Sequence, residues 1–487
     1  MHTHLKSFLG DAKRVGFFGL GASNLSLISM LPRHIRVTLR TDGNILPEQI
    51  PEGVSVEAIF EGEKALADLN EDILFLSPSV RRDRPELISA AEAGVVLSSD
   101  HELFFEYANA PVLAVSGSSG KSTTAYLTSA LINGSTARVI GNPEREPARN
   151  AAVGKEKDLA DKDASSLNRA VLCGNVGKPM LESISQSAAV YVTELSSFML
   201  MSHKATVRRS AITNISPNHL DFHKSMKEYS ESKLSLLRLS EEIIINADDE
   251  LLSKYAGRSR RVFGVYSARL SLPELLKKHK AKIYMTLEDG YICRNGAKII
   301  DTGRLIRREP HNIANMMCAL LLCDGYSDCK LWESVLSQFR GLPHRCEKIL
   351  EEDGVIYVNS SIDTTPERTA TTLRAFSENV ILLLGGRGKG LSYEPVFSAM
   401  RGRVKKVITF GEEGKGLAAD LPSEFCPRYL ESFDCAVREA CEIATCGDTV
   451  LLSPAATSYD GFSSFEERGK RFEELVRRSM IGKNSNI

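Results

Sequence analysis

The segment Ser116-Gly117-Ser118-Ser119-Gly120-Lys121-Ser122-Thr123 stands directly between an apolar strand candidate and a helical stretch. In such a loop, glycines let backbone N–H groups curl around phosphate oxygens, and the N-terminus of the next helix adds partial positive charge. The lysine reaches the β- and γ-phosphates, and the hydroxyl after it binds magnesium. The loop is shorter than the standard G-x-x-x-x-G-K-[ST] pattern, so a plain turn is the competing interpretation. The strand–loop–helix order favours a nucleoside triphosphate site.

Short apolar strands alternate with helical stretches through most of the rest of the chain. This alternation predicts an α/β fold with parallel sheets and crossover helices. The turn signals Asp289-Gly290 and Asn295-Gly296 predict a small antiparallel patch within residues 282–300. The expected strands are 14–20, 36–39, 73–77, 111–116, 190–194, 243–246, 380–384, 404–410 and 449–453.

The chain has 487 residues, too many for one hydrophobic core, so several domains are expected. We predict a first domain at residues 1–109, a second at 110–308 and a third at 309–487, with a linker at Arg307-Arg308-Glu309-Pro310 before the third. The segment 143–168 is polar and charged with few large apolar residues, and we interpret it as a surface insertion in the second domain.

Composition excludes several classes of protein. Hydrophobic residues make up 43% and charged residues 25%, and the net charge of −1 without a long basic run argues against nucleic acid or a membrane surface as partner. No stretch is long and apolar enough to span a bilayer, and the N-terminus has no signal-peptide pattern. The 10 cysteines show no Cys-x-x-Cys pair or zinc spacing, which favours reduced thiols in the cytoplasm.

A second glycine turn, Gly19-Leu20-Gly21-Ala22-Ser23-Asn24, also follows a strand candidate and precedes a helix. A dinucleotide site would need an acid at the end of the next strand, but that strand ends Thr38-Leu39-Arg40, which argues against an NAD site. Two interpretations stay open. One is a diphosphate bound at the helix N-terminus with Arg40 nearby, and the other is a plain tight turn.

Polar residues follow several later strand candidates, where ligands collect in open α/β sheets. Glu194 is a candidate magnesium ligand or water-orienting acid, as the acid on a second strand is in many phosphate-loop enzymes. His219 is a candidate for binding magnesium or a substrate phosphate. The run Gly385-Gly386-Arg387-Gly388-Lys389-Gly390 resembles another glycine-rich loop, with Lys389 as a carboxylate clamp, and its alternative is a solvated loop with two cations.

In this order, these segments resemble the Mur ligases over nearly the whole chain. The G-x-x-G-K-[ST]-[ST] pattern is shared with folylpolyglutamate synthases, whereas Glu-Leu-Ser-Ser-Phe at 194–198 and Phe-Glu-Glu-Arg-Gly at 465–469 are typical of the glutamate-adding branch. The resemblance implies a Rossmann-like N-terminal domain for a UDP-sugar, a central phosphate-loop ATPase domain and a Rossmann-like C-terminal domain for the amino acid. It also implies a monomeric, ATP-dependent ligase that joins UDP-N-acetylmuramoyl-L-alanine and D-glutamate through an acyl phosphate in peptidoglycan synthesis.

The resemblance also assigns residues by motif. Catalysis would depend on Lys121, Glu194, His219 and Lys233, and magnesium would bind Ser122, Glu194, His219 and Lys233. Lys233 would act as a carbamate formed with CO₂, because an ammonium repels magnesium whereas a carbamate presents an anion. An exposed helix lysine is the alternative. ATP contacts would extend from the loop 117–123 to Asn315, His344 and Arg345, UDP-sugar contacts would be Ala22, Ser23, Arg40, Ser79 and Asn175, and glutamate contacts would be Thr364, Lys389, Ser458 and Phe465.

The chain departs from the family pattern at three places. The family's Asn-Asp-Ser-Lys-Ala-Thr is here 359–364, with Ser360 in place of an acid and Ile362 in place of a lysine. Met199 stands where the family usually has a glutamine. Residues 39–41, Leu-Arg-Thr, replace the Asp-Thr-Arg run that the family has around the uracil. Two rival functions therefore stay open. One is a Mur-type ligase for another amino acid or L-glutamate, and the other is a nucleotide-binding relative without turnover.

Overall fold

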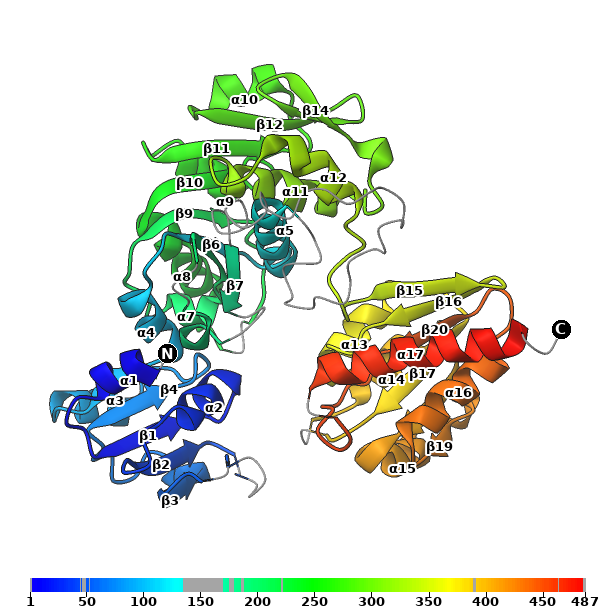
Figure 1. Ribbon diagram of the computed structural model, residues 1–487, viewed down its shortest axis with the longest axis horizontal. Coiled ribbons are helices and arrows are strands. Elements are labelled where there is room, and N and C mark those ends of the chain that lie inside the picture. The colour runs from blue at the N-terminus through cyan, green and yellow to red at the C-terminus, as the bar shows by residue number, and fades with distance from the viewer. Residues whose placement is uncertain are drawn as a thin grey trace, which may run out of the picture. The chain divides into compact units, whose positions relative to one another are not determined.

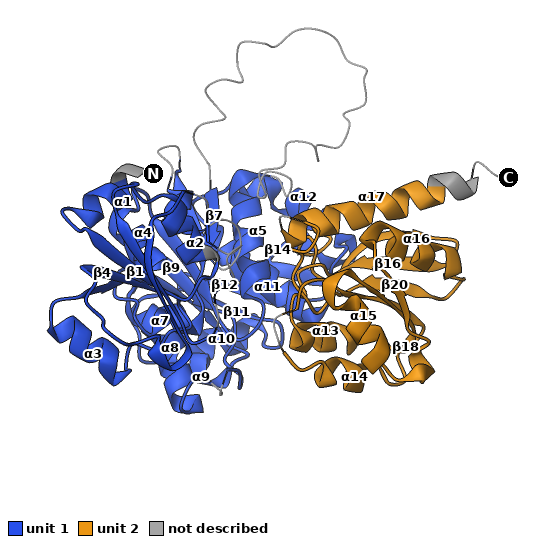
Figure 2. Ribbon diagram, turned by 90° about the horizontal axis from the view of Figure 1, so that it is seen from below, with its two compact units in different colours: residues 1–339 blue, residues 340–487 orange. Residues whose placement is uncertain are grey.

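Three β-sheets organise the described residues, each with helices packed on its faces (Figure 1). The computed structural model describes residues 2–43, 45, 50–51, 53–134, 170–174, 179–184, 188–219, 222–388, 391–462 and 464–484. The predicted insertion at 143–168 lies outside these residues. Two compact units result, residues 1–339 and 340–487 (Figure 2). The predicted α/β fold is confirmed, and the described residues form three sheets.

The first sheet is parallel throughout and has the order β3-β2-β1-β4-β5. Its central strands are almost wholly apolar and buried, as a sheet covered on both faces requires. The order reverses between β1 and β4, which is where Rossmann-like sheets bind ligands. The strands are β1 (Arg14–Phe18), β2 (Arg36–Thr41), β3 (Val56–Glu61), β4 (Ile73–Leu76) and β5 (Val96–Ser98), and the helices are α1 (His2–Leu9), α2 (Ala22–Ser29), α3 (Pro85–Glu92) and α4 (Asp100–Tyr107).

The second sheet has the order β14-β13-β12-β11-β10-β9-β6-β8-β7. The last three strands in chain order, β12, β13 and β14, pair antiparallel, which confirms the patch predicted from the two turn signals. The strands are β6 (Val112–Ser116), β7 (Ala170–Gly174), β8 (Val190–Glu194), β9 (Val207–Ile212), β10 (Ser240–Asn246), β11 (Val262–Ser267), β12 (Ile283–Glu288), β13 (Tyr291–Arg294) and β14 (Ala297–Asp301). The helices used below are α5 (Lys121–Asn133), α7 (Ser197–Leu200) and α8 (Met226–Arg238), with α9 (Glu250–Ala256), α10 (Leu272–Lys278), α11 (Pro310–Cys323) and α12 (Trp332–Ser337) around them.

Helix α11 packs against α5, the helix that begins with the phosphate-loop lysine. Residues 310–323, which the sequence analysis assigns to the third domain, therefore lie in the same unit as the second sheet. Buried Arg209 supports this packing, because its Nη1 donates to the carbonyls of Leu321, Leu322 and Asp324 at the end of α11. Those carbonyls have no partner inside the helix.

The third sheet forms the core of residues 340–487 and has the order β15-β16-β20-β17-β18-β19, parallel except at β15. Among the described residues of the whole chain, no helix has the length and apolar character needed to cross a membrane. The strands are β15 (Glu347–Glu352), β16 (Val355–Asn359), β17 (Val380–Gly385), β18 (Val404–Phe410), β19 (Arg428–Leu430) and β20 (Thr449–Leu452), and the helices are α13 (Pro366–Leu373), α14 (Glu394–Met400), α15 (Gly411–Asp420), α16 (Phe433–Ile443) and α17 (Phe465–Asn484).

Candidate active site

The glycine loop connects buried strand β6 to α5, as predicted. Gly117 and Gly120 have φ angles of 146° and 79°, a region that side chains rarely adopt. A Cβ at Gly117 would lie 1.9 Å from Thr213 Oγ1, and one at Gly120 would lie 2.3 Å from Asn315 Oδ1. Both positions therefore need glycine for two reasons, the backbone conformation and the neighbouring side chains.

Asn214, directly after β9, holds the loop in its curled shape. Its carbonyl accepts from Ser118 N at 2.9 Å, and its Oδ1 accepts from Ser119 N at 3.0 Å. Lys121 Nζ donates to the Ser118 carbonyl at 3.2 Å, which places the ammonium over the loop at the N-terminus of α5. The sequence analysis gave Asn214 no role. Its position after a strand that neighbours β6 was the available signal.

Ser122 and Glu194 meet beside this loop, as predicted for magnesium ligands. Strands β6 and β8 are neighbours, and Ser122 Oγ donates to Glu194 Oε2 at 2.7 Å, with the residues 6% and 3% exposed. Magnesium prefers hard oxygen donors such as a hydroxyl and a carboxylate. These two residues therefore fit the ion.

Lys233 lies on α8 and reaches into the same site, so the alternative of an exposed helix lysine is wrong. The residue is 1% exposed, its Nζ donates to the Gly117 carbonyl at 2.8 Å, and it lies 4.7 Å from the Tyr229 ring centre. Burial, with the nearby Lys121 charge, lowers the pKa of the Lys233 amine to about 7, against the opposing effect of Glu194. A neutral amine in this position can react with CO₂.

His219 has a less central position. It is exposed, its φ of 53° places it in the left-handed region, and its ring centroid is 5.0 Å from that of Phe198 on α7. Within the part of the chain that the structure describes, no cluster of three or more His, Cys, Asp or Glu side chains is arranged to hold a metal. A magnesium role for His219 stays a prediction.

Asn315, on α11, is far from the glycine loop in sequence but lies against it in the structure. Its Oδ1 is 3.4 Å from Thr124 Oγ1, and it is the nearest side chain to the Cα of Gly120 on the side where a Cβ would stand. Asn315 thus lies beside the glycine loop, and its contact with the nucleotide stays a prediction.

In the first sheet, the turn after β1 is fixed by Asn24 and not by a third glycine. Its Nδ2 donates to the carbonyls of Phe18 and Gly19 at 3.2 and 2.7 Å, and Ser77 Oγ, after β4, also donates to the Gly19 carbonyl. Ala22 and Ser23 begin α2 at this turn, and exposed Ser79 follows β4. These three predicted UDP-sugar residues thus follow β1 and β4, at the reversal of strand order.

Arg40 does not lie at this site as predicted. Its side chain is 1% exposed, its Nε donates to Glu71 at 2.6 Å, and its Nη atoms donate to three carbonyls between residues 65 and 68. The guanidinium also lies 4.2 Å from the centre of the Phe60 ring. A guanidinium enclosed and paired in this way is not available to a diphosphate.

A pocket of about 290 Å³ lies between the first and second sheets. Leu76, Ser77 and Pro78 line it from the end of β4, and Phe198 and Phe222 line it from the second sheet. It therefore connects the strand ends of the two sheets within residues 1–339.

The predicted glutamate site is at strand ends of the third sheet. Thr364 follows β16, Ser458 follows β20 and Phe465 begins α17, and β16 and β20 are parallel neighbours. Asp363, next to Thr364, is buried and accepts from Thr372 Oγ1 and Ser453 Oγ at 2.7 and 2.8 Å. It is a structural group that joins these two loops.

Arg468 is a residue that the sequence analysis missed. It is fully buried, and it donates to Ser361 Oγ and to the carbonyls of Ser361, Ala456 and Thr457 at 2.9–3.1 Å. Burial lowers the pKa of its guanidinium to about 10, so it remains charged at neutral pH. It ties together the loops that contain Thr364 and Ser458.

His344 and Arg345 precede β15 in the same unit. His344 is 6% exposed, its Nδ1 is 3.0 Å from Asn359 Nδ2, and a Cβ on Gly469 would lie 2.3 Å from the same nitrogen. Arg345 is exposed. Their nucleotide contacts stay predictions, and Asn175 and Lys389 lie outside the described residues.

Comparison with known proteins agrees with this geometry. Residues 115–323 match the Mur ligase middle domain, and residues 344–456 match the Mur ligase, glutamate ligase domain. The UDP-N-acetylmuramoylalanine--D-glutamate ligase of Acetivibrio thermocellus is 31% identical over 98% of this chain and 99% of its own. The enzyme of the same name from Clostridium tetani is 32% identical over 98% of both chains. Among solved structures, UDP-N-acetylmuramate-alanine ligase from Thermotoga maritima covers 97% of this chain, with 16% identity and a TM-score of 0.48.

Proposed function

This chain belongs to the Mur ligase family, and we propose from that membership that it joins D-glutamate to UDP-N-acetylmuramoyl-L-alanine in peptidoglycan synthesis. It is an ATP-dependent amide-bond ligase. The observation that carries this function is the convergence of Lys121, Ser122, Glu194 and Lys233 on one glycine loop. A nucleotide-binding relative without turnover would have no need to bury a lysine there.

The reaction has two steps. A carboxylate oxygen of the UDP-linked substrate attacks the γ-phosphorus of ATP, ADP leaves, and Lys121 stabilises the charge that spreads over the transferring group. The amine of glutamate then attacks the acyl carbon of the acyl phosphate and loses a proton, and phosphate leaves with the oxygen that the substrate contributed. The pocket between the two sheets would hold part of the UDP-linked substrate.

We assign magnesium to Ser122 and Glu194, with a carbamate on Lys233 completing the site. Magnesium would neutralise phosphate charge. Carbamate formation joins the neutral Lys233 amine to CO₂ and releases one proton. The burial of Lys233 beside Gly117 and its lowered pKa support this assignment, because a buried neutral amine is the form that reacts with CO₂.

We place the protein in the cytoplasm, as a monomer. All 10 cysteines lie in the described residues and none forms a disulfide, as expected of a reducing compartment.

The amino-acid substrate is tested by phosphate release across a panel. With ATP and UDP-N-acetylmuramoyl-L-alanine, we expect release with D-glutamate and background rates with L-glutamate, D-aspartate and L-lysine. A larger rate with another amino acid would replace D-glutamate by that substrate. No release with any amino acid would favour a nucleotide-binding protein.

We expect Lys389→Ala to raise the KM for D-glutamate strongly, with much smaller changes for ATP and the UDP-sugar. Ile362 leaves one cation fewer near this site, so Lys389 should contribute more to binding the carboxylates. Loss of one partner of a buried charge pair costs about 2–5 kcal/mol. Ser458→Ala and Thr364→Val should act in the same direction but more weakly, since each removes a neutral donor. Steady-state kinetics in all three substrates measures this, and equal losses in all three would contradict it.

A further inference from the structure

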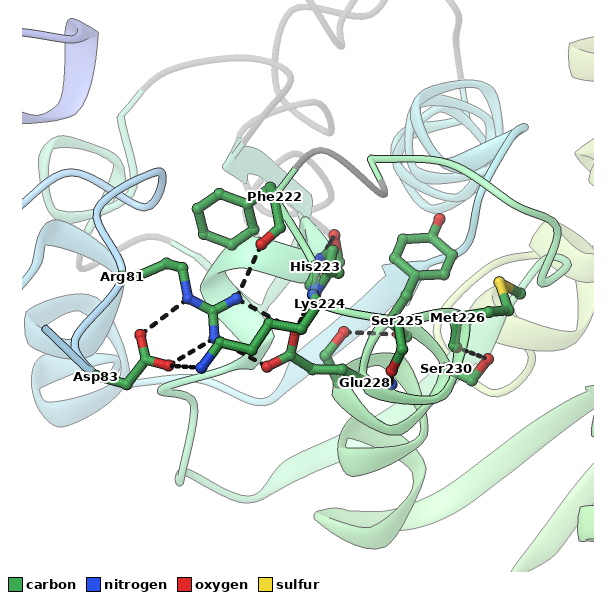
Figure 3. Close-up of polar contacts among 12 residues, drawn as sticks. Arg81, Asp83, Phe222, His223, Lys224, Ser225, Met226, Glu228 and Ser230 are labelled. Atoms are coloured by element: carbon green, nitrogen blue, oxygen red, sulfur yellow. Dashed lines mark hydrogen bonds and ion pairs between the residues drawn. The ribbon is translucent and has the colours of Figure 1, made fainter.

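A cluster of ion pairs joins the loop after β4 to the start of α8 (Figure 3). Arg81 donates through Nη2 to Glu228 Oε1 at 2.9 Å and through Nη1 to the Phe222 carbonyl at 2.9 Å. Its other edge binds Asp83 through Nε at 2.9 Å and Nη2 at 2.7 Å. Lys224 completes the cluster with a 2.7 Å bond from Nζ to Asp83 Oδ2. The Arg81 guanidinium, which lies in a loop of the first sheet, thus contacts both Phe222 and the first turn of α8.

Glu228 is the group through which this contact reaches the helix. It lies in the first turn of α8, where a carboxylate is favoured by the helix dipole, and it also accepts from Lys224 N at 2.6 Å. Arg81 chiefly lowers the pKa of Glu228, to about 2, so the pair stays ionised in any ordinary assay buffer. Lys233 follows Glu228 on the same helix.

Phe222, whose carbonyl accepts from Arg81, lies beside a residue that contacts α7, the helix that follows Glu194. Next to it, buried His223 places Nε2 3.0 Å from Ser197 Oγ, and its ring stacks on Phe198 at 5.8 Å. Ser197 and Phe198 begin α7, three and four residues after Glu194. Arg81 therefore contacts Phe222, whose neighbour His223 packs on the start of α7, close after Glu194 in the chain.

Arg81 has the properties of an anchored side chain and not of a surface ion pair. It is 16% exposed, compared with 31% for Arg84, and it makes a planar, two-sided set of bonds. Such paired geometry holds a side chain in one position better than a single contact of a lysine does. Arg81, Asp83 and Glu228 also form one wall of the 290 Å³ pocket.

We propose that Arg81 is a positioning residue, which through Glu228 and the Phe222 carbonyl aligns the Lys233 helix and residues 222 and 223 with the loop after β4. The inference rests on the proposed ligase function. Arg81 would act on the reaction through the protein groups it binds, Glu228 and the Phe222 carbonyl. Through this contact, Arg81 links the position of Lys233 on α8 to the first sheet, which is predicted to bind the UDP-sugar.

The test compares Arg81→Ala with Arg84→Ala in the full-length enzyme. Arg84 lies in the same loop and forms a two-bond pair with Asp42, at 2.8 and 2.7 Å, that stays within the first sheet's domain. We expect Arg81→Ala to lower kcat about 10- to 100-fold, the scale of a misplaced catalytic group, and to leave the KM for ATP and glutamate within about threefold. Arg84→Ala should keep kcat within about twofold.

A double-mutant cycle with Glu228→Ala separates positioning from general damage. If Arg81 acts through Glu228, the double variant should lose no more kcat than the worse single variant. Arg81→Lys should recover part of the loss, since it keeps the charge but not the two-sided geometry. A kcat of Arg81→Ala near that of the wild type, an equal loss in Arg84→Ala, or additive losses would overturn the proposal.

Hydrogen–deuterium exchange gives a readout that does not need turnover. Peptides covering 222–238 should exchange faster in Arg81→Ala than in Arg84→Ala or the wild type, and unchanged exchange would also overturn the proposal. If the wild-type enzyme makes no amide product, the proposed ligase function fails, and the exchange result still reports whether Arg81 holds α8.

Discussion

Lys121→Ala is expected to lower ligase turnover at least about 10³-fold, or ~4 kcal/mol, while the protein stays folded. Lys121 lies at the N-terminus of α5 with its ammonium over the loop, 3.2 Å from the Ser118 carbonyl. It is half-buried, so its removal deletes a positive charge where solvent replaces it poorly. Phosphate release under saturating substrates is the measurement.

Exposed Lys254 on α9 provides the control for Lys121, because its side chain is 71% exposed and pairs with Glu250 one helical turn away. Lys254→Ala should have wild-type kcat, and both variants should unfold at similar temperatures. Turnover close to wild type in folded Lys121→Ala would refute the phosphate-loop assignment.

Lys233→Ala is expected to be nearly inactive and to recover part of its activity with added acetate or formate. The small carboxylate would take the place of the carbamate anion in the magnesium site. The buried position of Lys233, 2.8 Å from the Gly117 carbonyl, leaves room for such an anion once the side chain is removed. Kinetics with and without the salt, at constant ionic strength, measure the recovery.

Lys227, exposed on the same helix, is the matched control for Lys233. Lys227→Ala should retain activity and show no response to acetate. The wild-type enzyme should lose activity when CO₂ is removed, and more so as pH falls through the Lys233 pKa of about 7, because protonation removes the reactive amine. Full activity of Lys233→Ala without a carboxylate would contradict the carbamate.

The sequence predicted the phosphate loop and its partners well because each signal is local. A glycine loop between an apolar strand and a helix has few alternative structures, and an acid at the end of a strand must lie near it once the strands are parallel neighbours. Glu194 and Ser122 meet for this reason. The antiparallel patch at β12–β14 was also predictable, since its turns have diagnostic residues.

Other features depend on packing that no single segment specifies. Arg40 looked available to a diphosphate because a strand end is where ligands bind, yet Glu71 and three carbonyls from elsewhere in the chain enclose it. Asn24 and Arg468 were given no role, although each fixes a loop beside a predicted site by donating to carbonyls distant in sequence. Strand β3 lacks the apolar run of a buried strand, whereas β9 and β11 are largely buried and were also not among the expected strands.

The central claim is that this chain forms an amide through an acyl phosphate, and isotope transfer tests it most directly. UDP-N-acetylmuramoyl-L-alanine labelled with ¹⁸O in its free carboxylate is incubated with ATP and D-glutamate, and product and phosphate are analysed by mass spectrometry. The account predicts a product carrying one D-glutamate and inorganic phosphate carrying one ¹⁸O per turnover. Phosphate without ¹⁸O, or phosphate release without a glutamate-containing product, would contradict it.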